Sequence, residues 1–334
     1  MASNGFFRGP LRWASGMVLA GGLLAAESNP VPIAELEAKA KTGDPKAQCE
    51  LALRLEAGQG VATNRAEATR LFREAAAKGY PRAQAALGDL LANATGVPRD
   101  EVKAVEWYRK AAAKGDDTAQ LGLGMAYGTG RGVPRDDLEA FDWLKKSAAR
   151  GNVRAQFWVG MVLEQGTGVP IDHREAAEWF RKSAEGGFSE AQFNLASMFG
   201  RGVGVTQDKA AALRWYLVAA KQGLPGAQRM AGAMYREGEG TPVDPIEAAK
   251  WYLRAAKQGD GEAQLELGRL YRAGQGVAKD LVEAYRWLSL ATEQRVAGAS
   301  EASLETTLEL APEQFAEGRR RVRAFTVVSE RQGP

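Results

Sequence analysis

Residues 119–151 read AQLGLGMAYGTGRGVPRDDLEAFDWLKKSAARG, and this stretch decides the fold because its pattern recurs along most of the chain. The opening dipeptide Ala-Gln begins at positions 47, 83, 119, 155, 191, 227 and 263, so each copy starts 36 residues after the previous one. An unbroken period of this length is typical of a solenoid, in which stacked copies complete one another's core. The sequence therefore predicts an all-α solenoid of seven 36-residue helix-turn-helix repeats over residues 43–295.

Each copy reads as two helices joined by a glycine-containing loop. In the third copy, Ala119, Leu123 and Tyr127 are spaced to lie on one face of a first helix, with the small residue Gly124 at its edge. Small side chains let two helices approach closely, so this edge is expected to contact the second helix. The paired glycines Gly130 and Gly132 indicate a loop with positive φ angles.

The second helix of each copy is predicted to begin at a repeated Asp or Asn, whose side chain can accept a hydrogen bond from the first turn. These residues are Asn64, Asp100, Asp136, Asp172, Asp208, Asp244 and Asp280. In five copies a glutamate follows three residues later, which predicts a reciprocal capping box. Its members would be Glu67, Glu139, Glu175, Glu247 and Glu283. The tryptophan that recurs from Trp107 to Trp287 is interpreted as a packing residue.

The ends of the chain depart from the repeat. Residues 27–42 are expected to form an N-terminal cap helix, residues 296–330 C-terminal capping helices, and residues 331–334 a frayed tail. Residues 1–26 are predicted to be a signal peptide, because Arg8 and Arg12 precede an uncharged apolar run that is too short for the roughly 20 residues of a membrane span. We therefore expect an exported protein, periplasmic or extracellular. The alternatives are an uncleaved signal that anchors the chain in an inner membrane, or a disordered N-terminus.

Composition argues against most kinds of enzyme and metal site. The net charge of +3 is too small for a dedicated phosphate-binding surface, so nucleic acid is not the expected partner. The single cysteine, Cys49, and the single histidine, His173, leave no cysteine-rich or histidine-rich metal site. No catalytic or cofactor-binding motif is present, so no catalytic residue, cofactor or metal is predicted.

The composite pattern AQxxLGxxYxxGxGVxxDxxxAxxWxxKAAxxG resembles the Sel-one-like repeat (SLR) family, relatives of the tetratricopeptide solenoids. The resemblance covers residues 43–295 and is most complete in repeats three to seven; repeat two departs from it with Ala94 in place of the first loop glycine. It implies a right-handed superhelix with a concave surface that serves as a scaffold for protein partners, often in exported or envelope-associated proteins. A secreted hydrolase acting on β-lactams or cell wall, and a binder of envelope glycan, remain as alternatives by analogy with cysteine-rich relatives.

The surface opposite the core face of the first helices is the candidate binding site. Its residues lie two, six and nine positions after the repeated alanine, and we predict that a partner peptide or helix lies along them. The apolar candidates are Leu121, Met125, Phe157, Met161 and Phe193, with Trp158 at the edge. The basic candidates, expected to hold an acidic group, are Arg229, Arg236, Arg269 and Arg272. The competing interpretation is that the apolar members belong to the core. Oligomeric state is not predicted.

Overall fold

The computed structural model describes residues 31–330. The expected signal peptide at 1–26 and tail at 331–334 lie outside the described residues. The chain divides into two compact units, the first ending at Ser183 and the second beginning at Ala184, and each is considered by itself.

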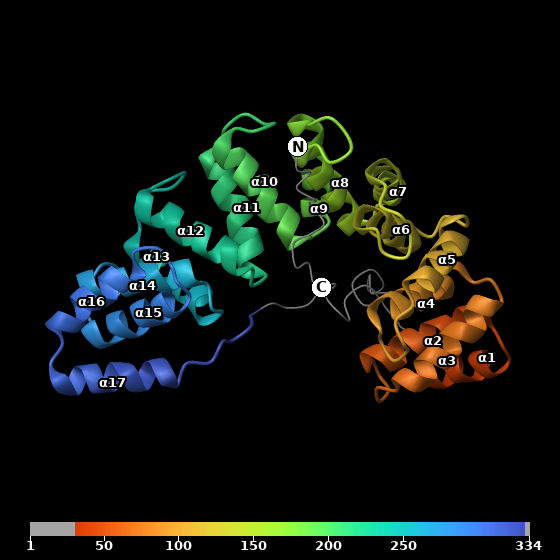
Figure 1. The fold of residues 1–334 in the computed structure, drawn as a ribbon, viewed down its shortest axis with the longest axis horizontal. Coiled ribbons are helices and arrows are strands. Elements are labelled where there is room, and N and C mark those ends of the chain that lie inside the picture. Colours follow the sequence, from red (N-terminus) through yellow and green to blue (C-terminus); the bar gives the residue numbers. More distant parts are fainter. Residues whose placement is uncertain (1–30, 331–334) are drawn as a thin grey trace. The chain divides into compact units, whose positions relative to one another are not determined.

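Every regular element within residues 31–330 is a helix (Figure 1), which confirms the predicted all-helical class and the seven helix pairs. The first helices of the repeats are α2 (Pro45–Ala57), α4 (Pro81–Asn93), α6 (Asp117–Thr129), α8 (Val153–Gln165), α10 (Ser189–Arg201), α12 (Pro225–Glu237) and α14 (Gly261–Ala273). The second helices are α3 (Arg65–Ala77), α5 (Glu101–Ala112), α7 (Asp137–Ala149), α9 (His173–Glu185), α11 (Lys209–Lys221), α13 (Pro245–Lys257) and α15 (Leu281–Glu293).

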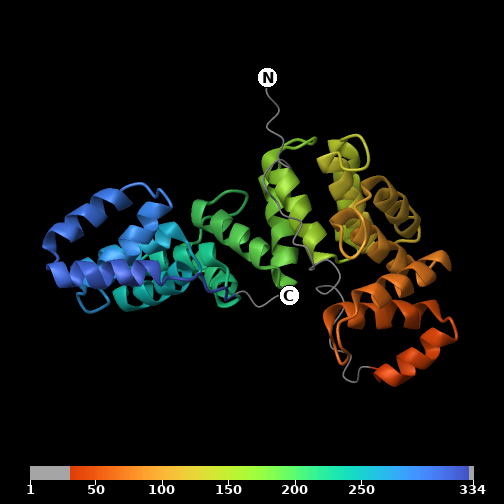
Figure 2. The same ribbon diagram turned by 60° about the horizontal axis from the view of Figure 1, so that its bottom comes forward.

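The terminal segments add three helices to these pairs. They are α1 (Ile33–Lys41) before the first repeat, and α16 (Ala299–Glu309) and α17 (Pro312–Arg323) after the last. α1 packs on α2, and both α16 and α17 pack on α15. Figure 2 shows α17 beside the helices of the second unit, from which the chain leaves as an extended segment.

The repeated Asp and Asn residues cap the second helices as predicted. Asp136, for example, accepts hydrogen bonds from the backbone N–H groups of Leu138 and Glu139 at 3.0 and 3.1 Å. The predicted capping box is wrong, however, because the N–H that the glutamate would accept is already used. The N–H of Asp136 donates to the carbonyl of Tyr127 at 3.0 Å, and the N–H of Asp280 donates to that of Tyr271 in the same way. The five glutamates are left to interact with other groups.

The first loop residue closes each first helix in the left-handed conformation. Gly130 has φ of 70°, and at the corresponding position of repeat two Ala94 adopts the same conformation with φ of 55°. The second loop glycine has a different purpose. A Cβ on Gly132 would lie 2.2 Å from the carbonyl oxygen of Glu101, and one on Gly276 would lie 2.0 Å from that of Pro245. The loop of each of these repeats therefore rests on the start of the preceding repeat's second helix.

The small residue of the first helix makes the close contact that the sequence predicts. A Cβ added to Gly88 would lie 2.6 Å from the Tyr108 ring, and Gly124 and Gly160 meet Leu144 and Phe180 at 2.7 and 2.8 Å. In each case the opposing residue directly follows the repeated tryptophan. This column of small residues lets the two helices of a repeat pack at short range, so a large side chain fills the space that each glycine leaves.

Candidate partner-binding surface

The apolar candidates of the first unit lie on α6 and α8 and differ in burial. Leu121 and Trp158 are 6% and 7% exposed, so they offer a partner almost no surface. Met125, Phe157 and Met161 are half-buried. The Phe157 ring contacts those of Trp158 and Phe180, with centroids 5.3 and 5.9 Å apart. Local packing therefore holds Phe157 in place while part of the ring stays accessible.

Phe193, on α10, is the apolar candidate of the second unit. It is half-buried, and its ring meets that of Tyr216 edge-on at 5.3 Å. A Cβ on Gly226, at the start of α12, would lie 3.5 Å from the same ring. Phe193 therefore packs within its own repeat and against the next one.

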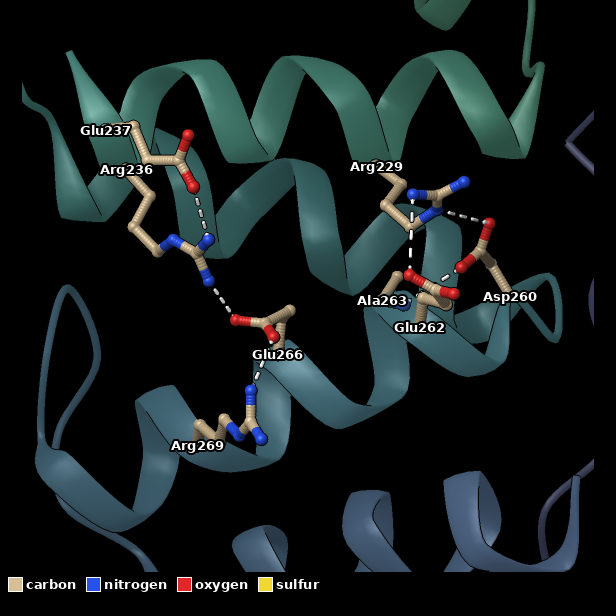
Figure 3. Close-up of polar contacts among 8 residues, drawn as sticks. All are labelled: Arg229, Arg236, Glu237, Asp260, Glu262, Ala263, Glu266 and Arg269. Carbon is tan, nitrogen blue, oxygen red and sulfur yellow. Dashed lines mark hydrogen bonds and ion pairs between the residues drawn. The ribbon is translucent and has the colours of Figure 1, made fainter. Parts of the chain in front are cut away.

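The four predicted arginines are all paired with carboxylates of the chain itself, and Figure 3 shows the pairs of Arg229, Arg236 and Arg269. Arg229 Nε lies 3.2 Å from the Asp260 carboxylate. Arg236 on α12 and Arg269 on α14 share the Glu266 carboxylate between them. Arg272 reaches Glu309 on α16 at 2.7 Å. The further carboxylates paired with these arginines are Glu237, Glu262 and Glu305.

These pairs change the electrostatic character of the predicted basic stretch. Four guanidinium groups meet six carboxylates, so the surface of α12, α14 and α16 is a lattice of alternating charge and not a bare cationic patch. Several of the acidic partners lie about one repeat later in the sequence. The arginine positions alone therefore do not reveal these pairs. Any acidic group of a partner would have to join or exchange with these pairs.

The sequence analysis did not identify a buried carboxyl at one of the first-helix positions that it singled out. Asp89 occupies position six of repeat two on α4 and is 4% exposed. The Tyr108 phenol donates to its Oδ1 at 2.6 Å, while its Oδ2 has no hydrogen-bond partner. Burial raises the pKa of Asp89 to about 7 against the lowering effect of the Tyr108 bond.

Comparison with known proteins identifies the repeat. The model of the family described as Sel1 repeat matches seven successive segments, at residues 45–80, 81–116, 118–152, 153–188, 189–224, 225–260 and 261–296. The chain belongs to the Sel1 repeat family. Sel1 repeat proteins generally act as scaffolds for protein–protein interactions and are typically not catalytic.

Solved Sel1 repeat structures are similar to this chain over most of its length. A Sel1 repeat protein from Oxalobacter formigenes is 36% identical, with 80% of this chain and 78% of that chain covered and a TM-score of 0.64. A protective antigen present in uropathogenic Escherichia coli strains, which displays an SLR fold, is 24% identical, with 89% and 94% covered and a TM-score of 0.44. No curated protein matches the chain significantly.

Between residues 31 and 330, no helix is both long and apolar enough to cross a membrane. In that same part of the chain, no group of three or more His, Cys, Asp and Glu side chains is placed to hold a metal ion.

Proposed function

We propose that this Sel1 repeat protein is an exported scaffold that binds a peptide or helix of a partner protein on the surface of its first helices. The observation that carries the proposal is the set of half-buried side chains Met125, Phe157 and Met161 on the consecutive first helices α6 and α8. Each still has apolar area to lose to a partner, at about 25 cal/mol per Å² of area removed from water. Aromatic and methionine side chains are also enriched at protein interfaces.

The phenylalanine and the two methionines would contribute to binding in different ways. The Phe157 ring is fixed by its contacts with Trp158 and Phe180, so little conformational entropy is lost when a partner covers it. Met125 and Met161 are flexible and polarisable and can adapt to the shape of a bound side chain. A rigid aromatic beside adaptable methionines favours an apolar anchor residue on the partner.

The arginine–carboxylate lattice of the second unit would supply polar contacts. Pairs between exposed side chains contribute only about 0–1 kcal/mol, so an acidic group of a partner can join or replace them at little cost. In this proposal Arg229, Arg236, Arg269 and Arg272 contribute specificity for an acidic partner, and the apolar anchors contribute most of the affinity.

Substitution at the apolar anchors tests the proposal. The double variant Phe157→Ala, Met161→Ala is expected to lose about tenfold or more in affinity for a partner captured by the full chain. Leu138→Ala is the matched control, because Leu138 is 61% exposed at the start of α7, away from the proposed surface. Unchanged capture by the double variant, with helicity intact by circular dichroism, would exclude this surface. Turnover of a chromogenic β-lactam by the native chain would replace the scaffold with the hydrolase alternative, and retention on envelope glycan with the glycan binder.

Export has its own test. It is supported by Arg8, Arg12 and the uncharged apolar residues that follow them. N-terminal sequencing of the mature protein is expected to begin close to residue 27. A mature protein that still begins at Met1 would contradict cleavage and leave the anchored alternative.

A further inference from the structure

The chain's own C-terminal segment shows how an extended peptide can bind to these repeats. After α17, residues 325–330 run against the second unit without forming a helix. The Phe325 ring meets Trp287 edge-on at 5.7 Å. Further along, the N–H of Val328 donates to the carbonyl of Lys257 at 2.9 Å, and the N–H of Glu330 donates to Gln258 Oε1 at 3.2 Å. Amides two residues apart face the same side, as they do in an extended strand.

The segment ends in a carboxylate site formed by repeat six. Gln228 Nε2 donates to Glu330 Oε2 at 3.1 Å, and Arg254 Nε donates to the same oxygen at 2.9 Å. Gln228 is the glutamine of the repeated Ala-Gln pair, and Arg254 lies three residues after Trp251 with its guanidinium 4.8 Å from that ring. The site therefore consists of a repeated amide and a cation that stacks on a repeated tryptophan.

Repeat one fills the equivalent site from within. Glu74 stands 180 residues before Arg254, five repeats earlier, and its Oε2 accepts a hydrogen bond from Gln48 Nε2 at 2.9 Å. The repeated glutamine thus binds a carboxylate in two different repeats, supplied in one case by the repeat itself and in the other by the C-terminal segment.

Repeats two, three and four have the glutamine and the cation but no carboxylate. Lys110, Lys146 and Lys182 occupy the Arg254 position, with Nζ 4.2, 4.0 and 4.1 Å from the ring centroids of the preceding tryptophans. None of the three lysines has a recorded ion pair within residues 31–330. The glutamines of these repeats, Gln84, Gln120 and Gln156, are buried. Gln84 Nε2 and Gln156 Nε2 donate to the carbonyls of Ala76 and Ala148 at 3.1 and 3.2 Å, as Gln228 Nε2 donates to that of Ala220 at 3.1 Å. In repeat six the same amide nitrogen also donates to the Glu330 carboxylate, so the amides of repeats two to four present the matching donor.

The tryptophans next to the C-terminal segment are more buried than those of repeats two to four. Trp287, beneath Phe325, is 1% exposed, and Trp251, beneath Arg254, is 9% exposed. The corresponding Trp107, Trp143 and Trp179 are half-buried, with exposed lysines over them. A half-exposed tryptophan keeps apolar surface that a partner can cover.

We propose that repeats two to four form a row of carboxylate sites for an extended acidic peptide of a partner protein. Each site pairs a repeated glutamine with a lysine: Gln84 with Lys110, Gln120 with Lys146, and Gln156 with Lys182. The glutamine and the lysine bind a glutamate or aspartate side chain, and the adjacent tryptophan packs against the apolar residues between the acidic ones. Three cations in a row complement a negatively charged segment. The lysines and tryptophans of these sites lie on the second helices, and the glutamines are the buried residues that follow the repeated alanines of the first helices. None of them belongs to the first-helix surface of the proposed function.

A labelled peptide with the sequence of residues 325–330, FTVVSE, amidated at its C-terminus, is a suitable probe because the chain itself binds that sequence. Fluorescence polarisation with the full chain is expected to show binding. The triple variant Lys110→Met, Lys146→Met, Lys182→Met should raise the Kd about tenfold or more, since methionine keeps the stem over each ring but removes the charge. The peptide FTVVSQ, which lacks the carboxylate, should bind to the native chain as weakly as FTVVSE binds to this triple variant.

The control variant Arg109→Met, Lys145→Met, Arg181→Met removes the same number of charges one residue earlier and should leave the Kd within about twofold, as should Phe157→Ala. No binding, or equal loss in both triple variants, would overturn the proposal. Loss on Arg254→Met instead would show that the probe only exchanges with the chain's own segment. A native chain that dimerises in light scattering, and loses both the dimer and the site on Glu330→Gln, would assign these sites to a second copy and not to a partner.

Discussion

The Tyr108 phenol donates a 2.6 Å hydrogen bond to the Asp89 carboxyl, and both residues are buried. The Tyr108 ring fits there because Gly88 on α4 and Gly122 on α6 have no Cβ to obstruct it. Repeat six has a buried tyrosine at the same position, Tyr252, but Ala233 at the position that corresponds to Asp89. In repeat five, Tyr216 at the same position forms a hydrogen bond with Ser197, which corresponds to Asp89. What distinguishes repeat two from repeats five and six is that the partner of the tyrosine is a buried carboxyl.

Tyr108→Phe should lower the free energy of unfolding by about 1–3 kcal/mol, because it leaves a buried carboxyl without its donor. Tyr252→Phe is the matched control and should cost less, since the residue that corresponds to Asp89 is Ala233, whose side chain cannot accept a hydrogen bond. Urea unfolding of both variants checks the difference. Equal losses would mean that the hydrogen bond contributes nothing beyond the packing of the ring.

The Asp89 carboxyl should make the folded protein less stable as the pH rises from about 4 to about 7. Burial raises the pKa of Asp89 from 3.8 to about 7, and the nearby carboxyls of Asp116 and Glu56 raise it further while Arg154 lowers it. In this range the folded chain keeps a proton that the unfolded chain has lost, so each pH unit costs at most about 1.4 kcal/mol from this group. Urea unfolding over this range should show a shallower pH dependence for Asp89→Asn. Parallel curves for the variant and the native chain would contradict the assignment to Asp89.

Ala94→Gly should stabilise the protein by about 1 kcal/mol, because alanine pays a steric cost at φ of 55° that glycine does not. The reciprocal change at the corresponding position of repeat three, Gly130→Ala, should destabilise by a similar amount or more, because its Cβ would also lie 3.3 Å from that of Arg135. Thermal unfolding compares the two. Destabilisation by Ala94→Gly would show that chain entropy outweighs strain at this turn.

Glu266→Gln should remove a carboxylate from two arginines at once, because Arg236 and Arg269 both pair with it; Arg236 keeps its pair with Glu237. Stability should change by no more than about 1 kcal/mol, since these side chains are partly exposed. Binding of an oligoglutamate peptide should become several-fold tighter at low salt, and the gain should disappear at high salt. Glu237→Gln, which removes only one of the two carboxylates at Arg236, should have a smaller effect. An unchanged affinity would remove these arginines from the binding surface.

The features that repeat every 36 residues could be predicted from the sequence. The helix pairs, the Asp and Asn caps and the glycine contacts with Tyr108, Leu144 and Phe180 follow from the spacing of residues within one repeat. Local chemistry is enough for these features, because each depends on residues of one helix or of one helix pair.

The relationships that cross repeats could not be predicted in the same way. The pairing of Arg236 with Glu266 spans 30 residues, and that of Gln228 with Glu330 spans 102. The capping box failed for a related reason: the Asp136 N–H is taken by a carbonyl of the preceding helix, which no pattern of side chains reveals. The burial of Phe157 also depends on its neighbours: its ring packs against Trp158 and Phe180, yet the residue stays half-buried.

The second loop glycine limits how proteins of this kind can change in length. Because Gly132 and Gly276 fit against the carbonyls of Glu101 and Pro245, the start of the second helix in one pair receives the loop of the next pair. Duplicating or deleting a whole repeat recreates that fit at the new junction. Inserting or deleting part of a repeat leaves a loop without its matching helix start. The length of this protein should therefore evolve in whole steps, one helix pair at a time.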